Sequence, residues 1–324
     1  MPANLTPEFR KARDRFNRAR TPEEKLAALE EMLATIPKHK GTDKMQGDIR
    51  KKIARYRNME SASKKSGRGP GIDHIPKEGA GQGVLIGSPN AGKSSLLTAL
   101  TNARPEVAEY PFSTIVPVPG MMAFEDIAIQ MIDLPPVSPE YTEGWVYSLI
   151  RAADFGFLVL DSTDGTLLED EILEIYNQLE QHHIELARQA EETEDERVRR
   201  LPTRILLTKT DAAESIPAIE NADLAVFSVS ATTGTGLDEV RRAAFEALRI
   251  LRVYTKLPGK KPDMTEPYSL PIGSTALDVV KAVHREFVER LKYVRVWGSG
   301  RFDGQQVPSD HVLEDGDIVE IHLQ

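Results

Sequence analysis

Residues 87–94 read Gly-Ser-Pro-Asn-Ala-Gly-Lys-Ser, which matches the phosphate-binding pattern G-x-x-x-x-G-K-[ST]. The apolar run 84–86 just before them predicts a strand, and the run 95–100 just after them predicts a helix. A strand, a glycine-rich loop and a helix in this order direct backbone N–H groups and the positive end of a helix toward phosphate oxygens. The stretch therefore predicts an α/β nucleotide-binding domain; a chance glycine-rich turn is the alternative, and the flanking elements argue against it.

The residues of this loop have separate predicted roles. Gly87 and Gly92 let the backbone curl around phosphate, Lys93 reaches the outer phosphates, and Ser94 holds magnesium. The predicted nucleotide contacts in this loop are Gly87, Asn90, Ala91, Gly92, Lys93, Ser94 and Ser95.

Three later strand ends carry polar residues that narrow the nucleotide to guanine. Asp133 ends an apolar strand and is placed to meet magnesium through water. Asp211 offers a carboxylate to the ring N–H and amine of guanine, while the stem of Lys209 packs on the base. Each alone could be a cap or turn residue, but their order favours guanine over adenine. The predicted base contacts are Thr208, Lys209, Asp211, and Ser230 with Ala231 through a backbone N–H.

Composition excludes several classes of function. The chain has 324 residues, 40% of them apolar and 28% charged, which is ordinary for a globular protein of two or three domains. It contains no cysteine, so disulfides, thiol nucleophiles and Cys-based zinc sites are excluded. No apolar stretch approaches membrane-spanning length and the N-terminus lacks a signal-peptide pattern, so we expect a cytoplasmic protein without a membrane span.

Charge is distributed unevenly along the chain. Residues 1–70 contain 18 Lys and Arg against 9 Asp and Glu, although the whole chain has a net charge of −9. A basic arm on an acidic body suggests a polyanionic partner, with RNA as the first candidate. A solvated pair of charged helices is the alternative, and charge alone does not separate the two.

The pattern of the chain predicts three parts with a linker. Residues 1–60 predict a basic helical region, with one helix over 8–20 and a helical hairpin over 21–60 whose first helix is capped by Thr21. Residues 61–83, rich in Ser, Lys, Gly and Pro, predict a linker. Residues 252–324 predict a small α+β domain with four strands and one helix, which Thr275 caps and which carries Phe287.

Residues 84–251 predict the P-loop domain: a mostly parallel sheet with helices on both faces, because apolar strands alternate with amphipathic helices. Residues 190–200 are highly charged and predict a surface loop. The predicted helices are Ser94–Thr101, Gly144–Ala152, Glu169–Arg188 and Leu237–Leu251, and the predicted strands are Val84–Ile86, Met121–Phe124, Ile127–Asp133, Phe155–Asp161, Ile205–Lys209 and Ala225–Ser230.

The order P-loop, Asp-x-Pro, [NT]-K-x-D and Ser-Ala resembles a translation-factor-type GTPase. Residues 110–120 (Tyr-Pro-Phe-Ser-Thr-Ile-Val-Pro-Val-Pro-Gly) resemble the first switch of the Obg superfamily. The segments 253–256, 293–298 and 310–317 resemble a TGS domain, a ubiquitin-like β-grasp module, and residues 39–42 are similar to DRG-type GTPases (developmentally regulated GTP-binding proteins).

This resemblance implies a cytoplasmic protein that binds GTP and GDP with magnesium, hydrolyses GTP, and associates with the ribosome or RNA. By the same match Thr114 is the switch threonine, so Lys93 and Thr114 are the implied catalytic residues, and Ser94, Thr114 and Asp133 the implied magnesium ligands. Asn90 stands where related GTPases can bind potassium; a polar residue that stabilises the turn is the alternative.

The chain departs from the family pattern at three positions. Pro136 replaces the glycine of Asp-x-Pro-Gly and has no N–H for the γ-phosphate, and Val137 stands where a catalytic Gln could orient water. Thr208 replaces the usual Asn, a milder change. We therefore expect slow hydrolysis. The rival readings are a hydrolysis-deficient scaffold that docks RNA or a protein through its terminal domains, and a P-loop ATPase or kinase.

Overall fold

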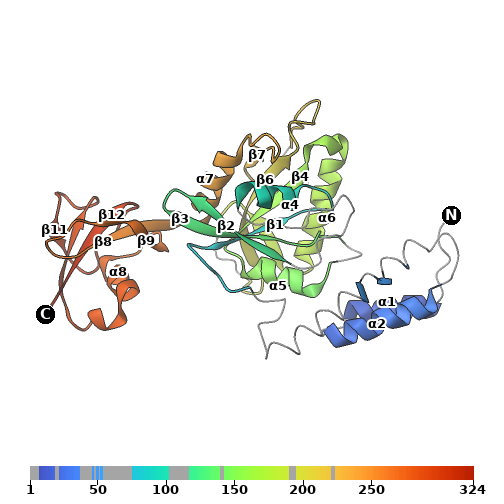
Figure 1. The fold of residues 1–324 in the computed structure, drawn as a ribbon, viewed down its shortest axis with the longest axis horizontal. Coiled ribbons are helices and arrows are strands. Elements are labelled where there is room, and N and C mark those ends of the chain that lie inside the picture. The colour runs from blue at the N-terminus through green and yellow to red at the C-terminus, as the bar shows by residue number, and fades with distance from the viewer. Residues whose placement is uncertain are drawn as a thin grey trace. The chain divides into compact units, whose positions relative to one another are not determined.

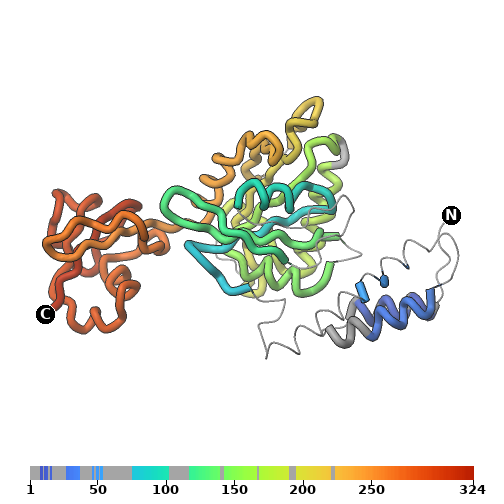
Figure 2. Tube along the Cα trace, in the orientation of Figure 1, coloured from blue at the N-terminus to red at the C-terminus, as the bar shows by residue number. Residues whose placement is uncertain are grey.

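The computed structural model describes residues 7–18, 22–36, 46, 49–50, 52–53, 75–101, 117–138, 142–189, 195–219 and 223–324. The chain divides into two units, Met1–Gly71 and Ile72–Gln324. Figure 1 labels helices and strands of both units where there is room. Within the second unit two sheets follow each other along the chain, the first cyan to gold and the second orange to red in Figure 2, so their strands do not interleave.

Among the described residues of the first unit are the helices α1 (Pro7–Arg18) and α2 (Pro22–Thr35). Arg15 of α1 forms an ion pair with Glu31 of α2 at 2.8 Å. The predicted helix over 8–20 is thus present with slightly earlier bounds, and it shares one core with the predicted hairpin. That core contains Phe9, Ala12, Leu29, Met32, Ile36, Ile49 and Ile53. The predicted cap Thr21 and most of residues 37–60 lie outside the described residues.

The first sheet of the second unit has the order β2-β3-β1-β4-β6-β5, with β7 also paired to β6. All described pairings are parallel except that of β2 with β3, so the sheet is mostly parallel as predicted. The strands are β1 (Gln82–Ile86), β2 (Val118–Phe124), β3 (Ile127–Asp133), β4 (Phe155–Asp161), β5 (Ile184–Ala187), β6 (Arg199–Thr208) and β7 (Val226–Ser228).

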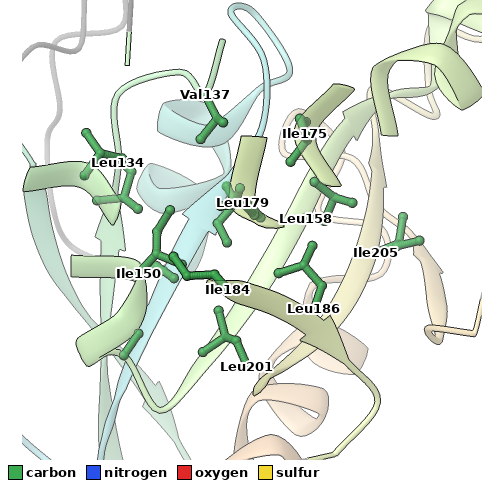
Figure 3. Close-up of a cluster of buried hydrophobic side chains, with 14 of the residues drawn as sticks. Leu134, Val137, Ile150, Leu158, Ile175, Leu179, Ile184, Leu186, Leu201 and Ile205 are labelled. Atoms are coloured by element: carbon green, nitrogen blue, oxygen red, sulfur yellow. The ribbon is translucent and has the colours of Figure 1, made fainter. Parts of the chain in front are cut away.

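Helices cover both faces of this sheet, which confirms the predicted α/β architecture. Alternate residues of β1 serve opposite faces: Val84 and Ile86 pack in one apolar cluster and Leu85 in another. The first cluster includes α5 (Gly144–Ala152) and α6 (Leu168–Glu180), and Figure 3 shows its side chains. The second includes α4 (Lys93–Leu100) and α7 (Leu237–Leu248).

The predicted helix Glu169–Arg188 is wrong at its C-terminal end. Helix α6 stops at Glu180, His183 takes a left-handed φ of 57°, and strand β5 follows. Ile184 and Leu186 alternate into the core as β5 pairs with β6 (Figure 3), so tertiary pairing overrides the local helical pattern.

Other predicted boundaries shift for similar reasons. The charged stretch 190–200, predicted as a loop, already contains the start of β6 at Arg199. Helix α7 ends at Leu248 instead of residue 251, because Arg249 takes a left-handed φ of 51° and the next strand begins at Ile250. Strand β1 begins at Gln82, two residues earlier than predicted, and pairs with Gln130 of β3.

The second sheet has five strands, not the predicted four, in the order β11-β10-β12-β8-β9. The added strand, β11 (Gln305–Val307), is too short to show an apolar alternation. Helix α8 (Ala276–Val283) starts after Thr275 as predicted, but Phe287 belongs to a separate 3₁₀ turn, Arg285–Phe287. The remaining strands are β8 (Ile250–Lys256), β9 (Asp263–Pro271), β10 (Leu291–Trp297) and β12 (Asp317–Leu323).

No helix among the described residues is long and apolar enough to cross a membrane.

Candidate nucleotide-binding site

The P-loop joins β1 to α4 with two residues in the left-handed region. Gly92, just before α4, has a φ of 92°, and Asn90 has a φ of 65°. Gly87 is required by close approach: a Cβ there would lie 2.3 Å from the carbonyl oxygen of Val159 on β4. The loop is therefore tightly curled against the sheet, the shape that directs N–H groups toward an anion.

Lys93 is buried, with only 6% of its surface exposed. Its Nζ donates hydrogen bonds to the backbone oxygens of Gly87 at 2.8 Å and Ser88 at 2.7 Å. Burial lowers the pKa of Lys93 to about 8, and the charges of Asp133 and Glu171 offset part of this effect. A buried ammonium whose hydrogen bonds go to backbone carbonyls is suited to meet phosphate oxygens.

Ser94 and Asp133 come together from α4 and the end of β3. Ser94 Oγ donates to Asp133 Oδ2 at 2.5 Å. Asp133 is 0% exposed, and its buried Oδ1 has no hydrogen-bond partner among the residues that the structure describes. Burial raises the pKa of Asp133, while the Ser94 hydrogen bond and the charge of Lys93 oppose the rise. An oxygen left open beside a hydroxyl fits a hydrated magnesium ion, which prefers such oxygen ligands.

Thr208 has a role that the sequence did not predict. Its Oγ1 donates to the backbone oxygen of Ala91 at 2.6 Å and of Leu160 at 3.1 Å. The side chain therefore ties β6 to the P-loop and to β4, and its hydroxyl is used by the protein itself.

Asp211 and Ser230 meet at the ends of β6 and β7, as expected for a base site. Ser230 Oγ donates to Asp211 Oδ1 at 2.6 Å and accepts from the N–H of Thr233 at 3.1 Å. The backbone N–H of Ser230 already donates to Thr235 at 3.0 Å. Of the predicted Ser230–Ala231 pair, the N–H of Ser230 is therefore used within the protein, and the predicted base contact through Ala231 stays a prediction.

Sequence reasoning missed two carboxylates of this site. Asp161, the last residue of β4, forms an ion pair with Lys209. Its position at a strand end was the signal that could have revealed it. Burial raises the pKa of Glu171 on α6, while its interaction with Ser88 of the P-loop and the charge of Lys93 oppose the rise. No sequence pattern points to Glu171, because only packing of α6 brings it to the loop.

The segment after Asp133 turns inward. Val137 donates its backbone N–H to the oxygen of Gly87 at 3.2 Å, and its side chain, 2% exposed, packs in the core with Leu134 (Figure 3). Pro136 is buried beside it. The position where a catalytic Gln was sought thus holds a core residue. Thr114 and most of the predicted first switch lie outside the described residues.

Two families match this chain. The 50S ribosome-binding GTPase family matches residues 82–192, which include the P-loop, and the TGS domain matches residues 251–323. The second match covers the sheet β8 to β12 almost completely.

Several relatives match this chain over almost its whole length. An uncharacterised GTP-binding protein of Methanocaldococcus jannaschii is 29% identical over 93% of this chain and 93% of its own length. Ribosome-interacting GTPase 1 of Saccharomyces cerevisiae is 27% identical over 92% of this chain and 98% of its own. Developmentally-regulated GTP-binding protein 2 of Homo sapiens is 26% identical, again over 92% and 98%.

Proposed function

We propose that this chain is a DRG-like GTPase of the Obg superfamily, which binds GTP and GDP with magnesium and hydrolyses GTP slowly to GDP and phosphate. The matches to the 50S ribosome-binding GTPase family and the TGS domain, and the whole-length relatives, support this proposal. Phosphate is held by Lys93 and the P-loop amides, magnesium by Ser94, Asp133 and Thr114, and guanine by Asp211. The remaining proposed contacts are Gly87, Asn90, Ala91, Gly92, Ser95, Thr208, Lys209, Ser230 and Ala231.

One observation carries this proposal: the unpartnered Oδ1 of Asp133, buried beside the hydroxyl of Ser94. A buried carboxylate oxygen without a donor is costly in a folded protein unless a ligand supplies the missing interaction. Magnesium bound there would offset the negative charge of the phosphates. Water is the nucleophile, and the protein contributes orientation and electrostatic stabilisation.

Slow hydrolysis follows from the segment that succeeds Asp133. Pro136 has no N–H, and the N–H of Val137 is already used by Gly87 at 3.2 Å. The apolar side chain of Val137 cannot orient water. The same observation favours a second candidate, a scaffold that binds GTP without turnover. Phosphate release over several turnovers, with and without ribosomes, separates them: no release under either condition supports the scaffold.

The central test is a nucleotide titration by calorimetry with GTP, GDP and ATP. We expect GTP and GDP to bind and ATP to bind at least about tenfold more weakly, because adenine lacks the donor pair that Asp211 accepts. Asp211→Asn should lower guanine affinity while inorganic pyrophosphate still binds. Unchanged selectivity in this variant would refute the base assignment, and equal binding of ATP would favour an ATPase or kinase.

Potassium is proposed as a second cation, next to Asn90. The left-handed backbone of Asn90, φ 65°, places this residue in the curled part of the P-loop. A cation there adds positive charge where the transition state gathers negative charge. GTP turnover should be faster in potassium than in sodium buffer, and Asn90→Ala should abolish the difference. Equal rates of the unmodified protein in both buffers would remove the potassium proposal.

The proposed partner is the ribosome or RNA, and the proposed location is the cytoplasm. Two observations support this: the excess of Lys and Arg in residues 1–70, and the name of the yeast relative, ribosome-interacting GTPase 1. RNA binding by the basic arm should weaken steeply as salt rises, because phosphate contacts release counterions. A shallow salt dependence would favour a protein partner for the N-terminal region or the TGS domain.

A further inference from the structure

Asp161 is held at the end of β4 by contacts to both of its oxygens. Oδ1 accepts from the backbone N–H of Thr163 at 3.0 Å and from its hydroxyl at 2.7 Å. Oδ2 accepts from Nζ of Lys209. The residue is 7% exposed, and these hydrogen bonds lower its pKa although burial acts in the opposite direction. A carboxylate fixed in this way has a defined rotamer before any ligand arrives.

Lys209 is the residue that this carboxylate restrains. It follows β6 directly and has a φ of 56°, a left-handed conformation that a lysine adopts at a cost of roughly 1–2 kcal/mol. Although Asp161 holds the ammonium, 40% of the side chain stays exposed, compared with 10% for Asp161. The ammonium group of Lys209 is therefore held in place, and part of the rest of its side chain remains exposed to a ligand.

The strand register brings this pair to the proposed base site. Asp161 lies directly opposite Thr208, the residue before Lys209, in the pairing of β4 with β6. Thr208 in turn bonds Ala91 of the P-loop at 2.6 Å. Asp211, two residues after Lys209, is joined to Ser230 at 2.6 Å. Along the chain, the restrained lysine thus lies between the residue that bonds the P-loop and the carboxylate proposed for guanine.

Restraint of a lysine has an energetic consequence for binding. A free lysine stem has several rotatable bonds, and ordering it against a ligand costs up to about 2 kcal/mol of conformational entropy. A stem that is already ordered avoids this loss when a flat ring packs on it.

From this geometry we infer that Asp161 is a positioning residue for purine binding: it fixes Lys209 so that the lysine stem forms one wall of the base slot. Asp161 touches neither the phosphates nor the hydrogen-bonding edge of the base. It contributes to affinity for any purine nucleotide, whereas Asp211 supplies the choice of guanine. The inference rests on the proposed guanine-nucleotide site.

The test compares Asp161→Asn with the unmodified protein for three probes: GDP, XDP and inorganic pyrophosphate, each with magnesium. We expect GDP and XDP affinities to fall by the same factor, roughly tenfold, since the substitution removes one charge-assisted hydrogen bond. Pyrophosphate has no base, so its affinity should not change. An equal loss for pyrophosphate would mean general loosening of the site and would overturn the positioning role, as would unchanged GDP affinity.

A double-mutant cycle shows whether Asp161 acts through Lys209. Lys209→Met keeps an aliphatic stem without the charge, so it should lose GDP affinity by a similar factor and make Asp161→Asn silent in its background. Additive losses would overturn the inference. Should Asp161→Asn fail to fold, Lys209→Met alone decides: unchanged GDP affinity contradicts the proposal.

Asp195→Asn is the matched control, because Asp195 also pairs with a basic side chain, Arg197 at 2.9 Å, in an exposed loop. It should leave all three affinities unchanged. If the unmodified protein binds pyrophosphate but neither GDP nor XDP, the proposed function fails before Asp161 is tested. If the unmodified protein binds GDP and the Asp161 variants bind it as well as the Asp195→Asn control does, the proposed function stands and this inference is wrong.

Discussion

Two buried aspartates, one in each sheet domain, are treated differently by their surroundings. In the TGS domain Asp317, 1% exposed, accepts from Ser299 N at 2.7 Å, Ser299 Oγ at 2.5 Å and Glu314 N at 2.9 Å. In the P-loop domain Asp133, 0% exposed, accepts from Ser94, and its second oxygen meets no hydrogen-bond partner in the described part of the chain. A saturated carboxylate stabilises a fold; one left open is available to a ligand.

One lysine in each domain, with little of its surface exposed, shows the same contrast between the two domains. Lys256 pairs with the buried Glu320 at 2.7 Å and lies 4.2 Å from the ring centroid of Trp297. Lys93 bonds backbone oxygens at 2.7–2.8 Å, and its pKa falls to about 8. The charge of the TGS lysine is balanced by a carboxylate of the protein, whereas for the P-loop lysine we expect a bound anion to supply that balance.

The largest expected difference between the domains is in nucleotide affinity. Lys93→Met should weaken GTP and GDP binding by about 100- to 1,000-fold, the range found when a pre-positioned donor to an anion is removed. Lys256→Met in the TGS domain is the matched control and should leave affinity unchanged. Calorimetric titration of both variants measures the contrast, and a loss for Lys256→Met comparable to that for Lys93→Met would contradict it.

The next difference is in stability, and here the larger loss is expected in the TGS domain. Asp317→Asn places an amide against N–H donors and should destabilise the TGS domain by about 2–4 kcal/mol. Asp133→Asn should leave the nucleotide-free P-loop domain at least as stable as before, because it removes a buried charge. Urea unfolding followed by Trp297 fluorescence in a Trp145→Phe background reports the first change, and unfolding of the P-loop domain followed by Trp145 in a Trp297→Phe background reports the second.

The variants of these two aspartates are expected to differ in both stability and magnesium binding. A stability loss for Asp133→Asn as large as that for Asp317→Asn would show that Asp133 is structural. Magnesium titration completes the comparison: Asp133→Asn should weaken magnesium-dependent GDP binding by roughly 10- to 100-fold, and Asp317→Asn should not.

Lys93 also predicts a pH dependence. Its pKa is about 8 in the folded protein and 10.5 as the ordinary value, so above pH 8 the unfolded chain binds more protons at this position. Stability of the nucleotide-free protein should therefore rise between pH 8 and 10.5, by up to about 3 kcal/mol from this group. The difference between the unmodified protein and Lys93→Met in urea unfolding isolates the contribution. A difference that does not change over this window would show that Lys93 is not desolvated.

The smallest effect provides a baseline. Lys281 forms an exposed pair with Asp278 on α8 at 3.0 Å, with side chains 52% and 39% exposed. Lys281→Ala should change stability by less than about 0.5 kcal/mol, because solvent screens such pairs. Thermal unfolding measures it, and a larger loss would mean that the exposed and buried charges of the TGS domain differ less than their environments imply.

The sequence by itself determined the α/β class, the P-loop and the order of the strand-end residues. These features are local: glycine positions, apolar runs of strand length and turn residues carry their own physical constraints. The boundaries of β3, β4 and α5 could be read in this way, since each is an apolar or amphipathic segment bounded by polar residues. The pairing of Ser94 with Asp133 follows from parallel strands ending at one edge.

Only the tertiary structure decided the features that depend on contacts between distant segments. Strand β5 forms because the segment that contains Ile184 and Leu186 pairs with β6. The local sequence pattern alone does not require a strand. The hydroxyl of Thr208 bonds the backbone oxygen of Ala91, and Lys209 pairs with Asp161. Glu171 interacts with Ser88, although its helix lies more than eighty residues away in sequence. Side-chain partners of this kind are set by packing and burial, which no short-range pattern encodes.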